Sequence, residues 1–119
     1  RNFHSGLAME VLWSDPCPEH GKHESPRGAG VLFGPDVTER FCVLNNLECC
    51  VRSHEVELGG YRWQDGGRCV TVFSAANYMG RTGNLGAVCH LTPKGGNDTR
   101  ALDMSFTTFA GAGVQTSRL

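Results

Sequence analysis

The stretch from Val51 to Tyr78 constrains the fold more than any other part of the chain. Its short apolar runs are separated by turn sequences, above all Asp65–Gly67, and this pattern predicts three strands joined by turns and followed by a loop. His54 comes just after the first strand, and Tyr78 lies in the loop after the last. Polar side chains at neighbouring strand ends are typical of a catalytic or metal-binding rim, but an ordinary β-meander with a capped loop also fits this stretch.

The remaining sequence predicts an α+β fold with mostly antiparallel strands and one clear helix, at about residues 35–46. Pro and Asp suit the first turn of this helix, and the two asparagines suit its exit. Val37, Phe41 and Leu44 share one helical face, which we expect to pack on a sheet. Residues 16–30 are rich in Pro and Gly and are expected to form a loop. The expected strands, including the three of the Val51–Tyr78 stretch, cover residues 9–13, 47–52, 61–63, 68–74, 85–91 and 101–109.

Two further polar residues are candidates for a site. Asp15 follows the first expected strand, where it fits either a functional carboxylate or a turn aspartate bonded to its own backbone. Arg27 precedes a glycine and could offer a planar fork to a phosphate, although an exposed arginine is usually only solvated. Cys17, His20 and His23 have a spacing that suits zinc, but a structural zinc site needs four ligands and no second pair lies nearby.

Composition narrows the class of protein. With 119 residues, 16 glycines and 39% apolar residues, we expect one domain with a modest core. A net charge of −1 without a Lys/Arg run argues against nucleic acid as a partner. No apolar segment approaches the roughly 20 residues that cross a bilayer, so no membrane partner is expected.

The cysteines and the first residue lead to two further expectations. Five of the six cysteines lie inside apolar runs, where a cysteine behaves as a small hydrophobe, and this indicates a reduced, intracellular protein. The chain begins with Arg1 rather than Met, which favours a fragment or a processed piece.

A resemblance to a known family rests on four segments that occur in order and at matching spacing. They are LWSDP (Leu12–Pro16), RGAGVLFGPDVTERF (Arg27–Phe41), VRSHEVELGGYRW (Val51–Trp63) and GGRCVTVFSAANYMGRTGNLGAV (Gly66–Val88). Together they resemble the C-terminal part of the catalytic domain of the PPP family of serine/threonine-protein phosphatases, in the calcineurin-like metallophosphoesterase superfamily. Within the family, the sequences of these segments are most similar to the subtypes linked to TPR repeats or to EF-hands. The resemblance implies a partial catalytic domain over residues 1–109 and a flexible tail over residues 110–119.

The resemblance also implies a fold and an activity. The fold would be the C-terminal portion of a four-layer β-sandwich flanked by helices. Two divalent metal ions, manganese or iron and zinc, would lie at the strand ends and share a hydroxide that attacks phosphorus in phosphoserine or phosphothreonine. The implied partners are phosphoprotein substrates and regulatory domains or subunits, and the implied location is the cytoplasm or the nucleus.

Residue by residue, the resemblance assigns four positions. His54 matches the family's last metal-ligand histidine, and Arg27 matches a phosphate-binding arginine. Tyr78 matches a tyrosine that lines the phosphate site and a toxin-binding groove, and Asp15 matches a residue beside the active site. We therefore expect Arg27, Tyr78 and Asp15 to be catalytic, and His54 to be a metal ligand.

The family's remaining metal and acid–base motifs do not occur in this sequence. GDxHG, GDxVDRG and GNHE are absent, so His54 is one metal ligand of a larger set. A dinuclear centre cannot be held by one histidine and solvent, and we expect this chain alone to be inactive. Two alternatives remain open: a non-catalytic interaction module that uses the phosphatase groove, and a small Cys/His zinc-binding domain.

Overall fold

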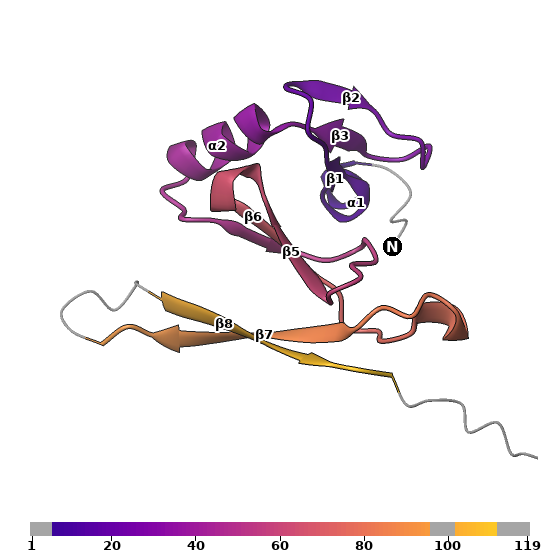
Figure 1. Ribbon diagram of the computed structural model, residues 1–119. Helices are drawn as coiled ribbons and strands as arrows, with labels where there is room; N and C mark the ends of the chain where they lie inside the picture. The colour runs from indigo at the N-terminus through magenta and orange to yellow at the C-terminus, as the bar shows by residue number, and fades with distance from the viewer. Residues whose placement is uncertain (1–5, 96–101, 112–119) are drawn as a thin grey trace, which may run out of the picture. The chain divides into compact units, whose positions relative to one another are not determined.

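The computed structural model describes residues 6–95 and 102–111. In chain order its elements are α1 (Leu7–Trp13), β1 (Asp15–Pro16), β2 (Lys22–Glu24), β3 (Val31–Phe33), α2 (Pro35–Leu44), β4 (Cys50–Arg52), β5 (Tyr61–Gln64), the 3-10 turn η1 (Asp65–Gly67), β6 (Cys69–Val72), the 3-10 turn η2 (Tyr78–Gly80), β7 (Gly86–Pro93) and β8 (Leu102–Phe109) (Figure 1). The α+β class is confirmed, but the described ranges contain two α-helices rather than one. None of the helices within those ranges combines the length and the apolar character needed to span a membrane.

The chain divides into two compact units, which are described separately. The first unit comprises residues 1–55 and 62–71, and the second comprises residues 56–61 and 72–119. Of the expected tail over residues 110–119, only residues 110 and 111 are described, and residues 112–119 lie outside the described part of the chain.

Both sheets that include strands of the first unit are three-stranded, with orders β1-β3-β2 and β4-β6-β5. In the first, β1 runs parallel to β3, with Asp15 opposite Leu32, whereas β2 is antiparallel to β3. In the second, β4 runs parallel to β6, with Val51 opposite Val70. The sheets of this unit are therefore mixed, with two parallel pairs beside the antiparallel pairing of β2 with β3. The β-meander is also excluded, because β4 neighbours β6 instead of β5, the next strand along the chain.

Helix α1 corrects the expected strand over residues 9–13. A short apolar run cannot be assigned to helix or strand by periodicity alone, and here good helix formers such as Leu7 and Met9 follow Gly6. The helix ends at Ser14, whose backbone N–H and hydroxyl both donate to the carbonyl oxygen of Glu10, at 3.1 and 2.6 Å. A proline two residues further on stops the helix from continuing. Asp15 thus follows a helix, not a strand, and starts β1 itself.

Helix α2 confirms the predicted helix at 35–46. Pro35 occupies its first turn, and the Asp36 carboxylate beside it accepts a hydrogen bond from the Gly21 N–H at 2.8 Å. Asn45 caps the other end, where its side-chain amide donates to the Phe41 carbonyl oxygen at 2.8 Å.

The buried face of α2 differs from the expected one. Its buried residues are Thr38 and Cys42, while Phe41 and Leu44 are 51% and 72% exposed. The Thr38 hydroxyl donates to the Asp65 carboxylate in η1 at 2.5 Å, and this polar anchor turns the Thr38–Cys42 face inward. Apolar periodicity alone could not predict this choice.

The second unit is built around the antiparallel ribbon of β7 and β8. The two strands pair from Gly86 opposite Phe109 to Pro93 opposite Leu102. The Tyr61 ring stacks on Phe106, with ring centroids 3.9 Å apart and an interplanar angle of 3°. A side chain at Gly86 would collide with the Phe109 ring, because a Cβ there would lie 2.5 Å from it.

Candidate functional site

Asp15 is the centre of a charged cluster in the first unit. Its Oδ2 accepts a hydrogen bond from Arg27 Nε at 2.5 Å, and its Oδ1 accepts one from Arg52 Nη2 at 2.5 Å. The residue is 4% exposed. Burial raises the pKa of the Asp15 carboxyl, but the hydrogen bond from Arg27 and the charge of Arg52 outweigh it and hold the pKa below its ordinary value. Asp15 is therefore an ionised carboxylate that fixes two guanidinium groups.

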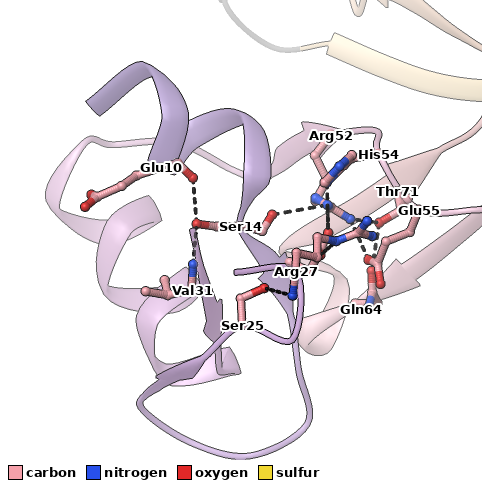
Figure 2. Close-up of polar contacts among 11 residues, drawn as sticks. Glu10, Ser14, Ser25, Arg27, Val31, Arg52, His54, Glu55, Gln64 and Thr71 are labelled. Atoms are coloured by element: carbon pink, nitrogen blue, oxygen red, sulfur yellow. Dashed lines mark hydrogen bonds and ion pairs between the residues drawn. The ribbon is translucent and has the colours of Figure 1, made fainter. Parts of the chain in front are cut away.

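Arg52 connects this carboxylate to three other groups, and sequence reasoning missed it. Its Nη1 donates to Glu55 Oε2 at 2.7 Å and to the Thr71 hydroxyl at 3.0 Å. Its Nη2 also donates to the Ser14 carbonyl oxygen at 3.2 Å (Figure 2). The sequence did contain a signal for Arg52, which stands at the end of an apolar strand. A charge that is buried at such a position must be paired.

A second layer of hydrogen bonds holds the residues around the cluster. The Thr71 hydroxyl, which accepts from Arg52, donates to Gln64 Oε1 at 2.9 Å and so ties β6 to β5. The Ser14 hydroxyl accepts from the Val31 N–H at 3.1 Å (Figure 2). Gly30 allows this close approach, because its φ is +66° and a Cβ there would lie 2.7 Å from the Ser14 nitrogen.

His54 lies against the same carboxylate. Its Nδ1 is 3.3 Å from Asp15 Oδ1, yet this buried nitrogen makes no hydrogen bond within the described ranges. Its ring meets the Trp13 ring edge-on, with centroids 5.3 Å apart. Its φ of 91° is a left-handed conformation that costs energy for a residue with a side chain, and such strain is concentrated at functional sites. A pocket of about 440 Å³ adjoins it, lined by Val11, Leu12, Val51, Arg52, Ser53 and His54.

Arg27 keeps donors available for a ligand. Asp15 binds its Nε, the side chain is 36% exposed, and its two terminal nitrogens make no hydrogen bond to the described residues. The loop that carries it is fixed by Ser25, which is 5% exposed. The Ser25 hydroxyl accepts from the Arg27 N–H at 3.2 Å, and its carbonyl oxygen accepts from the Gly28 N–H at 3.1 Å. Two parallel N–H donors on a fixed guanidinium suit a phosphate or a carboxylate.

Tyr78 belongs to the second unit, in η2. Its ring packs edge-on against Phe73, with centroids 5.3 Å apart, and its backbone N–H donates to Asn84 Oδ1 at 2.8 Å. Asn84 is 2% exposed, and its amide donates to the carbonyl oxygens of Ala75 and Leu85, each at 2.9 Å. Sequence reasoning missed this asparagine, although its place after a glycine in a turn was a signal. Asp15, Arg27 and His54 therefore come together in one unit, and Tyr78 is held by its own network in the other.

The spacing of Cys17, His20 and His23 does not produce a metal cluster. The Cys17 thiol donates to the Glu19 carbonyl oxygen at 3.4 Å, and His23 Nε2 lies 2.9 Å from the His20 carbonyl oxygen. Across residues 6–95 and 102–111, no group of three or more His, Cys, Asp or Glu side chains is arranged to hold a metal ion.

The fold matches a class of protein, the metallophosphoesterases. The chain superposes on a solved serine/threonine phosphatase from Saccharomyces cerevisiae that is described as similar to human phosphatase PP5. The match has a TM-score of 0.79 at 39% identity and covers 92% of this chain and 35% of that one.

Sequence relatives then define the family. The chain is 57% identical over 84 residues to serine/threonine-protein phosphatase T of Schizosaccharomyces pombe, covering 71% of this chain and 18% of the relative. It is 48% identical over 103 residues to human serine/threonine-protein phosphatase 5, covering 87% of this chain and 20% of the relative. No family model matches the chain. The chain belongs to the PPP family of serine/threonine-protein phosphatases and spans about a fifth of the length of these relatives, in their C-terminal part.

Proposed function

We propose that this chain is the C-terminal part of a protein that hydrolyses phosphoserine and phosphothreonine in other proteins with the help of two divalent metal ions. The observation that carries the proposal is the buried Nδ1 of His54, which has no hydrogen-bond partner among the described residues and lies beside the Asp15–Arg27 pair. A buried polar atom without a partner calls for a ligand, and a neutral imidazole nitrogen suits a divalent metal ion.

Each residue of the cluster has a role in this proposal. His54 holds a metal ion, and Arg27 uses its two terminal nitrogens to bind and orient oxygens of the phosphoryl group. Asp15 fixes Arg27 through Nε, so that the fork loses little freedom when the substrate binds. The metal ions, when bound, supply an activated water and offset the charge on the phosphoryl oxygens. The role of Tyr78, which belongs to the second unit, stays a prediction that rests on the resemblance.

The chain by itself would be inactive under this proposal. Among the described residues, His54 is the candidate metal ligand, and one histidine cannot hold two metal ions. The other ligands would come from sequence that precedes Arg1. An open reading frame that continues upstream with GDxHG and GNHE would support this arrangement.

A second candidate is a short interaction module without catalysis. The observation in its favour is the exposed apolar surface of α1, which has no buried residue and in which Leu7, Val11 and Leu12 are 77%, 70% and 59% exposed. An upstream sequence without the metal-binding motifs would favour this candidate over the enzyme.

A chimera tests the proposed enzyme. The N-terminal part of the catalytic region of the Schizosaccharomyces pombe relative would be joined to this chain, and hydrolysis of a phosphoserine peptide would be followed with manganese. We expect turnover that His54→Ala abolishes and that Arg27→Ala lowers by about 100-fold in kcat/KM. Arg40→Ala is the matched control, because Arg40 is exposed on α2. A folded chimera with His54→Ala that remains as active as the unaltered chimera would contradict the proposal.

A further inference from the structure

Three thiols gather at the opposite end of β4 from the charged cluster. Cys42 in α2 and Cys50 at the start of β4 have their Sγ atoms 3.9 Å apart. Cys69 in β6 is the residue directly opposite Cys50 in the parallel pairing. None of these cysteines forms a disulfide, and the phosphatase chemistry proposed above uses none of them.

The backbone fixes Cys42 and Cys50 in this arrangement. Both contact the carbonyl oxygen of Arg68: the Cys50 N–H donates to it at 2.9 Å, and the Cys42 Sγ lies 4.0 Å from it. The carbonyl oxygen of Cys42 accepts a hydrogen bond from the Leu47 N–H at 2.9 Å. Backbone hydrogen bonds therefore hold both ends of the connection between α2 and β4, and they keep the two sulfur atoms close together.

The two thiols differ in access. Cys42 is 0% exposed, whereas Cys50 is half-buried, so Cys50 is the sulfur that a small reagent can reach first. Burial, followed by the neighbouring Cys42, raises the pKa of Cys50 to about 12. Because the thiolate is the reacting form, oxidation at neutral pH is slow and accelerates as the pH rises.

We propose that Cys42 and Cys50 are a disulfide-forming site that takes a hydroperoxide as oxidant and links α2 covalently to β4. The Cys50 thiolate attacks one peroxide oxygen, the O–O bond breaks, and Cys50 becomes a sulfenic acid while the other oxygen leaves as an alcohol or as water. The Cys42 thiol then attacks the Cys50 sulfur and expels water. Two thiols and one hydroperoxide give one disulfide, one alcohol or water from the peroxide, and one water.

Two other pairings compete with this one. Cys49 is adjacent to Cys50 in the sequence, and Cys69 lies opposite it in the sheet. Consecutive Cα atoms across a trans peptide bond are about 3.8 Å apart, less than the separation that a disulfide usually spans, so Cys49 and Cys50 are poorly placed to pair with each other. Among the described contacts, the pair with Cys42 is the one in which Cys50 has a sulfur at 3.9 Å.

Peptide mapping of the complete 119-residue chain tests the proposal. The chain would be treated with hydrogen peroxide, quenched in acid, alkylated with N-ethylmaleimide and digested with a protease that cleaves after glutamate. Glu48 lies between Cys42 and the Cys49–Cys50 pair, so cleavage there separates the two partners. The proposal predicts two peptides joined by a disulfide, with Cys17, Cys49, Cys69 and Cys89 alkylated.

Two cysteine variants and the pH dependence of the rate identify the sulfur atoms that form the disulfide. Cys50→Ser should abolish the joined product, and the matched control Cys49→Ser should leave it unchanged. The rate of formation should rise roughly tenfold per pH unit between about pH 7 and pH 9, because the thiolate fraction rises by that factor. A disulfide found inside the Cys49–Cys50 peptide, or a joined product that includes Cys69, would overturn the proposal. Quantitative alkylation of Cys42 after peroxide would do the same, and this result is read from the unaltered chain, whatever the variants do to folding.

Discussion

The two ends of β4, a strand of three residues, lie in opposite chemical environments. At its start, Cys50 enters a cluster of uncharged thiols in which burial raises the pKa of Cys50 to about 12 and of Cys69 to about 11. At its end, Arg52 enters a cluster of charges that holds the pKa of Asp15 below its ordinary value, although Asp15 is buried. Burial is common to both ends, and the difference lies in whether the buried group has an opposite charge beside it.

The first unit therefore keeps its buried thiols and its charged cluster at different ends of the same strand. At the thiol end, burial and then the charge of Asp65 raise the pKa of Cys69, so the thiols stay neutral and behave as small apolar side chains. The charged end is held together by hydrogen bonds to Arg52. Within the described ranges, His54 Nδ1 is its buried side-chain atom without a hydrogen bond, and the terminal nitrogens of the partly exposed Arg27 make none either. Those atoms are the ones that a metal ion and a phosphate would need.

The largest expected effect comes from Arg52→Ala. It removes one of the two guanidinium partners of Asp15, which is 4% exposed, and the donor to the Thr71 hydroxyl. Losing one partner of a buried ion pair is strongly destabilising, but Arg27 stays beside Asp15, so we expect the free energy of unfolding to fall by about 3 kcal/mol. Urea unfolding followed by circular dichroism measures this change.

The matched control for this variant is Arg40→Ala, which removes an exposed arginine from the same unit. It should change the free energy of unfolding by less than about 0.5 kcal/mol. Equal effects of the two substitutions would mean that Arg52 does not organise the cluster.

A smaller effect is expected for Asn84→Ala in the second unit. The substitution removes the buried side chain that makes three part-buried hydrogen bonds around the Tyr78 loop, to backbone groups of Tyr78, Ala75 and Leu85. We expect a loss of about 2 kcal/mol and faster amide hydrogen exchange at Tyr78. Asn45→Ala is the control, because its amide makes a single exposed hydrogen bond. Unchanged exchange at Tyr78 would show that Asn84 does not hold this loop.

The smallest effect is a pH dependence that comes from the thiol end. Burial raises the pKa of Cys69 to about 11 and of Cys50 to about 12, above the ordinary thiol value of 9.0 that an unfolded chain would show. Between about pH 9 and pH 11 the unfolded chain releases these protons first, so the folded state loses stability as the pH rises. The variant with both Cys50→Ser and Cys69→Ser should show a shallower decline in urea midpoint over that range. An unchanged slope would contradict the assigned burial of the two thiols.

Sequence reasoning grouped the polar candidates better than it assigned the elements around them. Of the four candidates that the resemblance supplied, the structure brings Asp15, Arg27 and His54 together, whereas Tyr78 belongs to the other unit, and the roles of all four stay predictions. The helix at 35–46 was predicted because Pro35 and Asn45 mark its ends locally. By contrast, the strand expected over residues 9–13 is part of α1, because a short apolar run carries no decisive period.

What the sequence could not show depends on contacts between distant residues. The parallel pairing of β4 with β6 joins residues that a turn signal does not connect. The inward face of α2 is set by the hydrogen bond from Thr38 to Asp65, 27 positions away. Arg52 was missed for the same reason, since its partners Asp15 and Thr71 lie far from it along the chain.

The central claim is that this chain carries one part of a phosphatase site and needs the rest from elsewhere. Manganese-dependent hydrolysis of a phosphoserine peptide by the purified 119-residue chain tests it most directly, with the chimera described above as the positive control. The account predicts no hydrolysis above background by the chain and clear turnover by the chimera. Turnover by the chain alone that requires manganese and is lost in His54→Ala would contradict it.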